Sequence, residues 1–187
     1  MDRVARLVSQ NPHKLDELRA ALPGWTLEPW DGGALPPETG ATYYENARAK
    51  AEAGRSSDRW SLGEDSGIEV EGLGGGPGIL SARFAGPGED PVTKLLAQLE
   101  GMTGRAREAR YVCELVAFSP EGDEVRATGV LRGRIADGAR GTEGFGYDPI
   151  FVPTGEKRTV AELGNAWKRG HSHRALAAQA LLAALGT

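Results

Sequence analysis

The sequence has little cysteine: Cys113 is the only one among its 187 residues. One thiol excludes a disulfide framework within the chain and a zinc site built from several cysteines, and it is typical of proteins in a reducing compartment. No apolar stretch approaches the roughly 20 residues that cross a bilayer, and the N-terminus lacks a signal-peptide pattern. These absences predict a cytoplasmic protein with no membrane partner.

The sequence also lacks an excess of positive charge. The 22 lysines and arginines are outnumbered by 26 aspartates and glutamates, which gives a formal net charge of -4. This balance argues against a surface built to coat nucleic acid, and an RNA-binding function also conflicts with the lack of an extended basic stripe. The Walker pattern G-x-x-x-x-G-K-[ST] is absent as well. Any phosphate site must therefore be local and of another kind.

Helix and strand patterns alternate along the chain, which predicts one α/β domain over residues 1–187. A domain of this length buries roughly 70% of the surface that the unfolded chain exposes. Apolar periodicity, caps and turn residues predict the individual elements. We expect strands at 4–9, 26–30, 108–118 and 124–136, two strand pieces within 60–73 that meet at Ser66-Gly67, and helices from Asn11-Pro12, over 42–53, after Asp90-Pro91 and over 172–185. Because the 108–118 and 124–136 strands form a hairpin, the sheet is expected to be mixed.

The stretch "GEDSGIEVEG" at 63–72 places two carboxylates, Glu64 and Asp65, inside an alternating strand pattern. By itself this pattern is equally typical of a tight turn with solvated charges and of a metal-binding strand. In "SQNPHK", a helix N-terminus follows a strand, so its free N–H groups and Lys14 are suited to an anion. The alternative is a simple turn with Lys14 in solvent.

Three further stretches have both a structural and a functional interpretation. Asn46 and Lys50 are one helical turn apart, so they share a face that is either solvated or directed at a phosphate. The "FGYDPIF" loop holds aromatic rings suited to stacking on a planar base, although such rings are usually core. The two histidines of "KRGHSHR" do not define a metal site, but His173 is a candidate for contact with an anion or a base.

Taken together, these stretches form one ordered pattern. The blocks "SQNPHKLDEL", "ETGATYYENARAKA", "GEDSGIEVEGLGGGPGILSARFAG", "GFGYDPIF", "KRTVAEL" and "KRGHSHRALA" occur in this order between residues 9 and 178. In this set and order the chain resembles the non-canonical purine nucleoside triphosphate pyrophosphatases, the inosine triphosphatases. The resemblance implies a Mg²⁺-dependent hydrolase that converts ITP, dITP or XTP to the monophosphate and pyrophosphate. It also implies a cytosolic homodimer with an elongated mixed sheet flanked by helices and two lobes around a central active-site cleft.

The resemblance assigns roles to individual positions. It places the catalytic base at Asp65 and metal ligands at Glu38, Glu64 and Asp65. The implied substrate-binding residues are Ser9, Gln10, Asn11, Pro12, His13, Lys14, Lys50, Ser66, Phe145, Gly146, Tyr147, Asp148, Lys168, His173 and Arg174. The chemistry of the reaction agrees with these residue types, because cleavage between the α and β phosphates needs carboxylates for Mg²⁺ and cations for a tetraanionic triphosphate.

Two alternatives share parts of this pattern. The first is a Maf-like pyrophosphatase acting on methylated or pyrimidine nucleotides, against which "FGYDPIF" and the terminal "SHR" argue. The second is a nucleotide-binding regulatory module without catalysis, for which the loss of Lys14 or of a metal carboxylate is expected. Lys14 and the three carboxylates are all present, which favours an enzyme.

Overall fold

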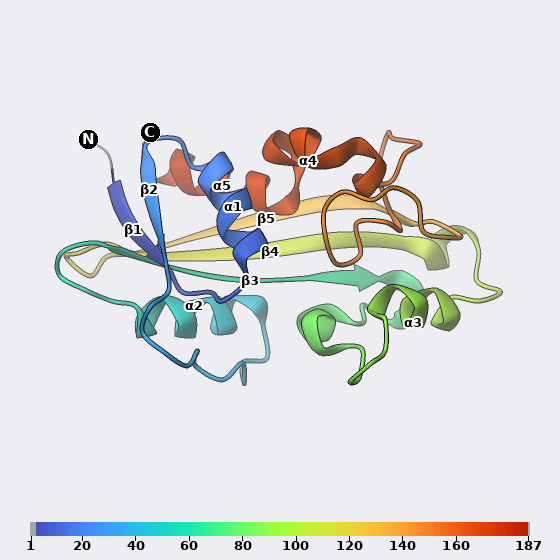
Figure 1. Ribbon diagram of the computed structural model, residues 1–187, viewed down its shortest axis with the longest axis horizontal. Helices are drawn as coiled ribbons and strands as arrows, with labels where there is room; N and C mark the ends of the chain where they lie inside the picture. Colours follow the sequence, from blue (N-terminus) through green and yellow to red (C-terminus); the bar gives the residue numbers. More distant parts are fainter. Residues whose placement is uncertain (1–2, 187) are drawn as a thin grey trace. The chain divides into compact units, whose positions relative to one another are not determined.

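The computed structural model describes residues 3–186, which divide into two compact units. Unit 1 comprises 3–65, 113–129 and 173–186, and unit 2 comprises 66–112 and 130–172. A six-stranded open sheet has the strand order β2-β1-β3-β4-β5-β6 (Figure 1). β1 is parallel to β2 and β3, whereas β5 and β6 are antiparallel. The expected mixed sheet flanked by helices is confirmed.

The elements have the following bounds. The strands are β1 (Arg3–Leu7), β2 (Trp25–Pro29), β3 (Trp60–Val70), β4 (Glu108–Phe118), β5 (Glu124–Ile135) and β6 (Phe151–Pro153). The α-helices are α1 (Pro12–Ala21), α2 (Tyr43–Ala53), α3 (Pro91–Gln98), α4 (Val160–His171) and α5 (His173–Ala184). Short 3-10 helices η1, η2 and η3 span Glu71–Leu73, Gly78–Arg83 and Gly104–Arg107. No helix within 3–186 is long and apolar enough to cross a membrane.

One expectation about the elements is wrong, and one helix was not expected. β3 is one continuous strand through Ser66 and Gly67, because residues on both of its faces are buried before and after this point. Helix α4 was not expected, although a capping box marks its start: Thr159 accepts a hydrogen bond from the backbone of Glu162, whose side chain in turn accepts one from the backbone of Thr159. His171 consequently lies at the end of α4, while His173 begins α5, in agreement with the helix expected over 172–185.

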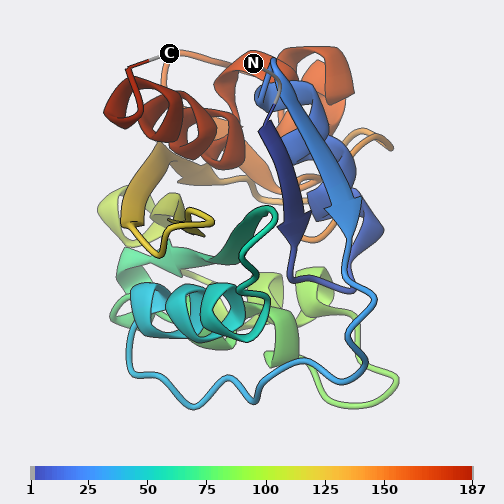
Figure 2. The ribbon, with the colours of Figure 1, turned by 90° about the vertical axis from the view of Figure 1, so that its left-hand side faces the viewer.

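In unit 1, helices cover both faces of the sheet. Apolar residues of α1 and α5 share one core cluster with Leu62 of β3 and Cys113 and Leu115 of β4. Ala47 and Ala51 of α2 pack on the other face. Figure 2 shows α2 on the opposite side of the strands from α1 and α5. Adjacent residues of β3 and β4 in this unit therefore face different helices.

Local sequence determines where the helices of unit 1 begin. The side chain of Asn11 accepts a hydrogen bond from the backbone N–H of His13 at 3.0 Å, and Pro12 occupies the first helical position. Thr42 and Glu45 form the capping box expected for α2. Both cap signals predict the observed start, which makes α1 and α2 the elements most directly specified by sequence.

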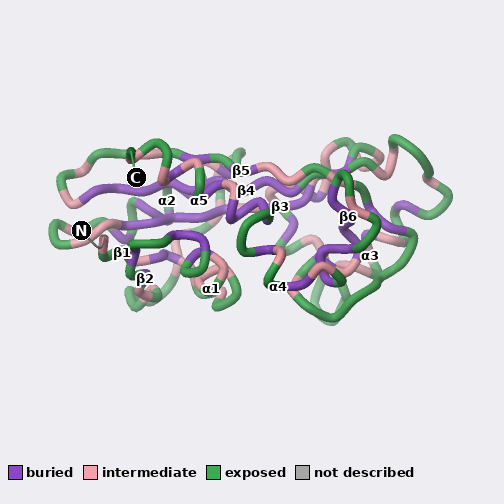
Figure 3. The backbone as a smooth tube through the Cα atoms, turned by 90° about the horizontal axis from the view of Figure 1, so that it is seen from above, coloured by how far each residue is buried: buried purple, intermediate pink, exposed green. Residues whose placement is uncertain are grey.

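Unit 2 has its own core. One apolar cluster buries Ile68 and Val70 of β3, Leu95 of α3, Leu99 directly after α3, and Phe151 of β6. The burial of Phe151 confirms the expectation that this aromatic is core. Figure 3 shows the purple, buried stretches of the strands and the green, exposed loops that connect the elements.

A glycine in β3 allows α2 to lie directly on the strand. A Cβ at Gly63 would lie 1.9 Å from the carbonyl oxygen of Ala47 and 2.5 Å from the nitrogen of Ala51, and both are backbone atoms that cannot rotate away. We expect Gly63→Ala to displace α2 and to lower the free energy of unfolding by about 1–3 kcal/mol, measured by urea denaturation. Gly138→Ala is the control, because a Cβ there meets nothing within 4 Å, and an equal loss in both variants would contradict this account.

Candidate active site

The two adjacent carboxylates of β3 belong to different environments. Successive side chains of a strand point to opposite faces. Asp65 contacts Asn46 and Lys50 of α2, whereas Glu64 contacts Lys14 of α1 and Arg174 of α5. Neighbours in sequence therefore serve two separate clusters on the two faces of unit 1.

Lys50 is the centre of the cluster on the α2 face. Its ammonium lies 2.5 Å from Glu38 Oε1 and 3.3 Å from Asp65 Oδ1, and it donates a hydrogen bond to the backbone carbonyl of Glu64 at 3.1 Å. Asn46 donates to Asp65 Oδ2 at 3.1 Å and accepts from the backbone N–H of Gly40 at 2.9 Å. Both oxygens of Asp65 are thus held in place, and the carboxylates of Glu38 and Asp65 converge on one cation.

Burial and charge shift the pKa values in this cluster. Burial raises the pKa of Asp65 above its ordinary 3.8, although the positive charge of Lys50 opposes this shift. Burial alone would lower the pKa of Lys50, but the negative charge of Asp65 and the hydrogen bond to Glu38 outweigh it and raise this pKa. An aspartate with a raised pKa beside a protonated lysine is an arrangement typical of catalytic sites.

Glu64 is the centre of the cluster on the α1 and α5 face. Its side chain is fully buried, and its Oε2 lies 2.5 Å from the ammonium of Lys14 while its Oε1 accepts from Arg174 Nε at 3.0 Å. Arg174 also donates to Glu17 Oε2 at 2.9 Å. The thiol of Cys113 lies 3.5 Å from Glu64 Oε1, and burial raises the pKa of this thiol well above its usual range. Two cations and two carboxylates thus form a linear ionic chain in the order Lys14, Glu64, Arg174 and Glu17.

The turn between β1 and α1 holds the first block of predicted residues. Ser9 Oγ accepts from the backbone N–H of Asn11 at 3.2 Å, and Asn11 in turn caps α1. The exposed Gln10 reaches Gly33 O at 3.2 Å, and His13 is exposed in the first turn of α1, directly after Pro12. The polar side chains thus order the N-terminus of α1, whose N–H groups suit an anion.

In unit 2, Asp148 organises the loop of the "FGYDPIF" block. The buried Asp148 accepts from Lys168 Nζ at 2.6 Å, from the backbone N–H of Phe145 at 2.9 Å and from Tyr111 Oη at 3.3 Å. The ammonium of Lys168 also lies 4.6 Å from the centroid of the Phe145 ring. Lys168, Asp148 and Phe145 are brought together as the sequence predicts, and Tyr111 joins them.

The two aromatics of this loop have different environments. Tyr147 is buried in the core of unit 2, where its hydroxyl donates to Ser81 O at 2.9 Å and burial raises its pKa to about 12. Phe145 is only partly buried, and Gly146 beside it is exposed. Phe145 is therefore the more accessible of the two rings, while Tyr147 anchors the loop. Ser66, also predicted at the substrate, is partly buried in β3.

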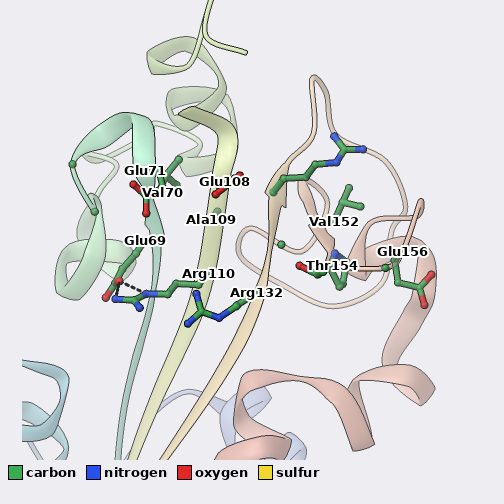
Figure 4. A pocket seen from close by; sticks show the side chains of 16 residues that line it. Glu69, Val70, Glu71, Glu108, Ala109, Arg110, Arg132, Val152, Thr154 and Glu156 are labelled. Carbon is green, nitrogen blue, oxygen red and sulfur yellow. Dashed lines mark hydrogen bonds and ion pairs between the residues drawn. The ribbon is translucent and has the colours of Figure 1, made fainter. Parts of the chain in front are cut away.

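A hollow of about 730 Å³ in unit 2 contains none of the predicted site residues. Figure 4 shows its charged side chains on β3, β4 and β5, with the ion pair between Glu69 and Arg110 at 2.6 Å. Arg132 and Glu156 also line it. Its charged side chains are exposed or partly exposed and of both signs, which is typical of a solvated sheet face and not of a phosphate site.

Comparison with known proteins settles the family. The model of the Ham1 family matches residues 5–184. The chain belongs to the Ham1 family. It is 45% identical to a dITP/XTP pyrophosphatase of Bdellovibrio bacteriovorus over 156 residues, which are 81% of this chain and 78% of that protein. A dITP/XTP pyrophosphatase of Deinococcus deserti is 43% identical over 93% of this chain and 85% of its own length.

Solved structures agree with this assignment. A HAM1 protein from Coxiella burnetii has a TM-score of 0.86 and 32% identity, covering 98% of each chain. A nucleoside-triphosphatase / dITP/XTP pyrophosphatase from Mycobacterium abscessus has a TM-score of 0.73 and 39% identity, covering 97% of this chain and 99% of that one. The suspected family and the fold expected from the six sequence blocks are confirmed.

The carboxylates of this Ham1 protein fit a Mg²⁺ ion in part. Within 3–186 no three histidine, cysteine, aspartate or glutamate side chains gather as a metal-holding group, so Glu64 does not complete a trio with Glu38 and Asp65. Mg²⁺ requires only one or two protein carboxylates when phosphate oxygens and waters supply its other ligands. Glu38 and Asp65 satisfy this requirement, because both approach the same cation, Lys50.

Sequence reasoning missed two residues of the candidate site, Glu17 and Tyr111, and the contact that a third residue, Asn46, makes there. Asn46 holds Asp65, and its spacing from Lys50 indicated a shared face without indicating this contact. Glu17 pairs with Arg174, but an acidic residue in an amphipathic helix does not indicate by itself which cation it will contact. Tyr111 reaches Asp148 across 37 positions of the chain, so nothing local predicts it.

Proposed function

We propose that this Ham1 protein hydrolyses non-canonical purine nucleoside triphosphates, namely ITP, dITP and XTP, to the monophosphate and pyrophosphate. The observation that carries the proposal is the cluster of Asp65, Asn46, Lys50 and Glu38, in which a carboxylate that is held at both oxygens adjoins a buried ammonium. Relatives with 43–45% identity are named dITP/XTP pyrophosphatases. The chain is thus a nucleoside triphosphate pyrophosphatase, a hydrolase of the nucleotide pool.

In the proposed reaction, Asp65 orients the attacking water and accepts its proton. Asn46 and Lys50 fix the carboxylate of Asp65, so this side chain is already oriented before the reaction begins. Its raised pKa makes it a better proton acceptor than an ordinary aspartate. Mg²⁺ bound by Glu38 and Asp65 would neutralise phosphate charge and polarise the phosphate oxygens.

The cations and the N-terminus of α1 would hold the triphosphate. Lys14 and Lys50 carry positive charge, and the N–H groups that follow Asn11 add hydrogen-bond donors and the positive end of the helix dipole. Ser9, Gln10, His13, Ser66, His173 and Arg174 remain predicted contacts of the substrate. These contacts act on the pyrophosphate as it departs and gains charge.

The pair of Lys168 and Asp148 explains a preference for 6-oxopurines. Hypoxanthine and xanthine present a C6 carbonyl acceptor next to an N1–H donor, and an ammonium beside a carboxylate is complementary to both groups. Adenine presents the opposite pattern, so its binding leaves buried polar groups unpaired. Guanine shares the C6 carbonyl and the N1–H, so exclusion of GTP requires discrimination at its 2-amino group.

Product analysis tests the proposed function. The protein is incubated with Mg²⁺ and, separately, with ITP, dITP, XTP, ATP, GTP or dTTP, and the products are separated by ion-exchange chromatography. We expect monophosphate and pyrophosphate from the first three, at least tenfold faster than from the others. Diphosphate and orthophosphate would contradict the proposed cleavage site, and preferential hydrolysis of dTTP would favour the Maf-like alternative.

We also propose that the protein acts as a homodimer in the cytoplasm. Cytoplasmic action follows from the substrate, because nucleoside triphosphates are used for nucleic-acid synthesis there. The dimer is an expectation from family resemblance, and sedimentation equilibrium of the purified chain measures it directly. A monomer mass at micromolar concentration would refute it.

A further inference from the structure

Glu64 faces away from the carboxylates that approach Lys50. Leu62, two residues earlier in β3, lies in the core cluster of α1 and α5, and Glu64 contacts Lys14 and Arg174 of the same two helices. Asp65 contacts α2 instead. A strand gives adjacent side chains opposite directions, so Glu64 is poorly placed to share one ion with Asp65.

Both carboxylate oxygens of Glu64 are also engaged. Oε1 accepts from Arg174 at 3.0 Å and lies 3.5 Å from the Cys113 thiol, while Oε2 lies 2.5 Å from the ammonium of Lys14. The side chain of Glu64 has an exposed fraction of 0%. A buried carboxylate between two cations is an anchor for those cations and has no surface directed at a solvated ion.

The members of this ionic chain differ in exposure. Glu64 and Arg174 are buried, with exposed side-chain fractions of 0% and 4%, and Arg174 is held from its other end by Glu17. Lys14 is the more exposed partner of Glu64, at 16%. The buried pair of Glu64 and Arg174 therefore holds a lysine whose ammonium is closer to solvent than the pair itself.

We propose that Glu64 is a positioning residue for Lys14, which holds the lysine ammonium where it meets the phosphates of the substrate. The proposal rests on the proposed function, in which Lys14 contacts those phosphates. An ammonium has three N–H donors. The ion pair with Glu64 fixes the end of this long flexible side chain, so its N–H donors have a defined position from which to meet the phosphates. Arg174 fixes Glu64 in turn.

A double-mutant cycle with inorganic tripolyphosphate tests this coupling without a base and without turnover. Affinity is measured by calorimetry without Mg²⁺ for the full chain and for Lys14→Met, Glu64→Gln and the double variant. We expect Lys14→Met to weaken tripolyphosphate binding about tenfold in the wild-type chain. In the Glu64→Gln chain the same substitution is expected to weaken binding at most twofold, because the new amide carries no charge to hold the ammonium of Lys14. A tenfold effect in both chains would overturn the proposal. The cycle cancels the general effect of removing one negative charge.

The metal dependence distinguishes positioning from metal ligation. Mg²⁺ is titrated into each chain at fixed tripolyphosphate concentration. We expect the half-saturating Mg²⁺ concentration to stay within twofold in Glu64→Gln and to rise at least tenfold in Glu38→Gln. A tenfold rise in Glu64→Gln would make Glu64 a metal ligand and overturn the proposal.

Glu114→Gln provides a matched control. Glu114 is a buried glutamate of the neighbouring strand β4, where it accepts from Arg126 at 2.8 Å and from Thr128 at 2.8 Å. The tenfold effect of Lys14→Met is expected to persist in this background, and its loss there would show that any buried glutamate produces the coupling. If Glu64→Gln does not fold, Glu64→Asp replaces it. The shorter carboxylate cannot reach both cations, so the effect of Lys14→Met is expected at threefold or less, and an unchanged tenfold effect would overturn the proposal.

The cycle separates this inference from the proposed function. Failure of the wild-type chain to hydrolyse dITP or XTP refutes the proposed activity but leaves the coupling measurable. Persistence of the full Lys14 effect without Glu64 refutes the positioning role even when the enzyme is active. Absence of any Lys14 effect in the wild-type chain refutes the contact of Lys14 with the phosphates, and with it the positioning role, while the activity is still decided by product analysis.

Discussion

Asp65→Asn is expected to lower kcat for dITP about 10³-fold and to leave the fold intact. The amide cannot accept the proton of the attacking water, and such a proton transfer contributes roughly 10²- to 10⁴-fold. Stability should change by no more than about 1 kcal/mol, because burial already disfavours the ionised form of Asp65 and Glu38 still pairs with Lys50. Steady-state kinetics and urea denaturation measure the two effects.

Asp16→Asn is the control for this prediction. Asp16 is an exposed residue of α1 with an exposed side-chain fraction of 73%, and its contact with Arg19 is at 3.8 Å. Its replacement is expected to leave kcat within twofold. Near-normal turnover of Asp65→Asn would remove Asp65 from the mechanism, and a matching loss in Asp16→Asn would mean that the assay reports general damage.

Asp148→Asn is expected to affect stability and catalysis together. The substitution leaves the buried ammonium of Lys168 without its carboxylate, and removal of one partner of a buried ion pair costs about 3–5 kcal/mol. It also weakens the hold on the backbone of Phe145 and on Tyr111. We expect kcat/KM for dITP to fall about 100-fold, with a larger fractional loss for dITP than for ATP.

Urea denaturation and parallel kinetics with dITP and ATP measure this prediction. Asp137→Asn is the control, because Asp137 is also an aspartate of unit 2 but has an exposed side-chain fraction of 94%. An equal fall for dITP and ATP would indicate that Asp148 only stabilises the protein. Retention of the dITP preference would likewise remove Asp148 and Lys168 from base selection.

Much of the fold was predictable from local sequence. The caps at Asn11 and Thr42 are local hydrogen bonds between residues two or three positions apart, so the starts of α1 and α2 are visible in the sequence itself. The turn that closes the hairpin of β4 and β5 is likewise local, with Ser119 N donating to Asp123 O at 2.9 Å. Helix α4 carries a signal of the same kind, the capping box of Thr159 and Glu162.

The residue types of the candidate site were also predictable, because six ordered sequence blocks point to one family. Their arrangement was not. Glu64 and Asp65 are adjacent in sequence and resemble one metal-binding pair, yet the pleat of β3 assigns them to opposite faces and different helices. Which helix covers each face depends on packing of segments distant in the chain.

The sequence by itself determined the family, the mixed α/β fold and the chemical groups available, since these depend on periodicity, local capping and residue identity. Only the tertiary structure decided which groups meet. Arg174 lies 110 positions from Glu64, and Tyr111 lies 37 positions from Asp148. Such contacts are selected by the burial of apolar surface on both sides of the strands, and no local pattern encodes the partner of a charge across that distance.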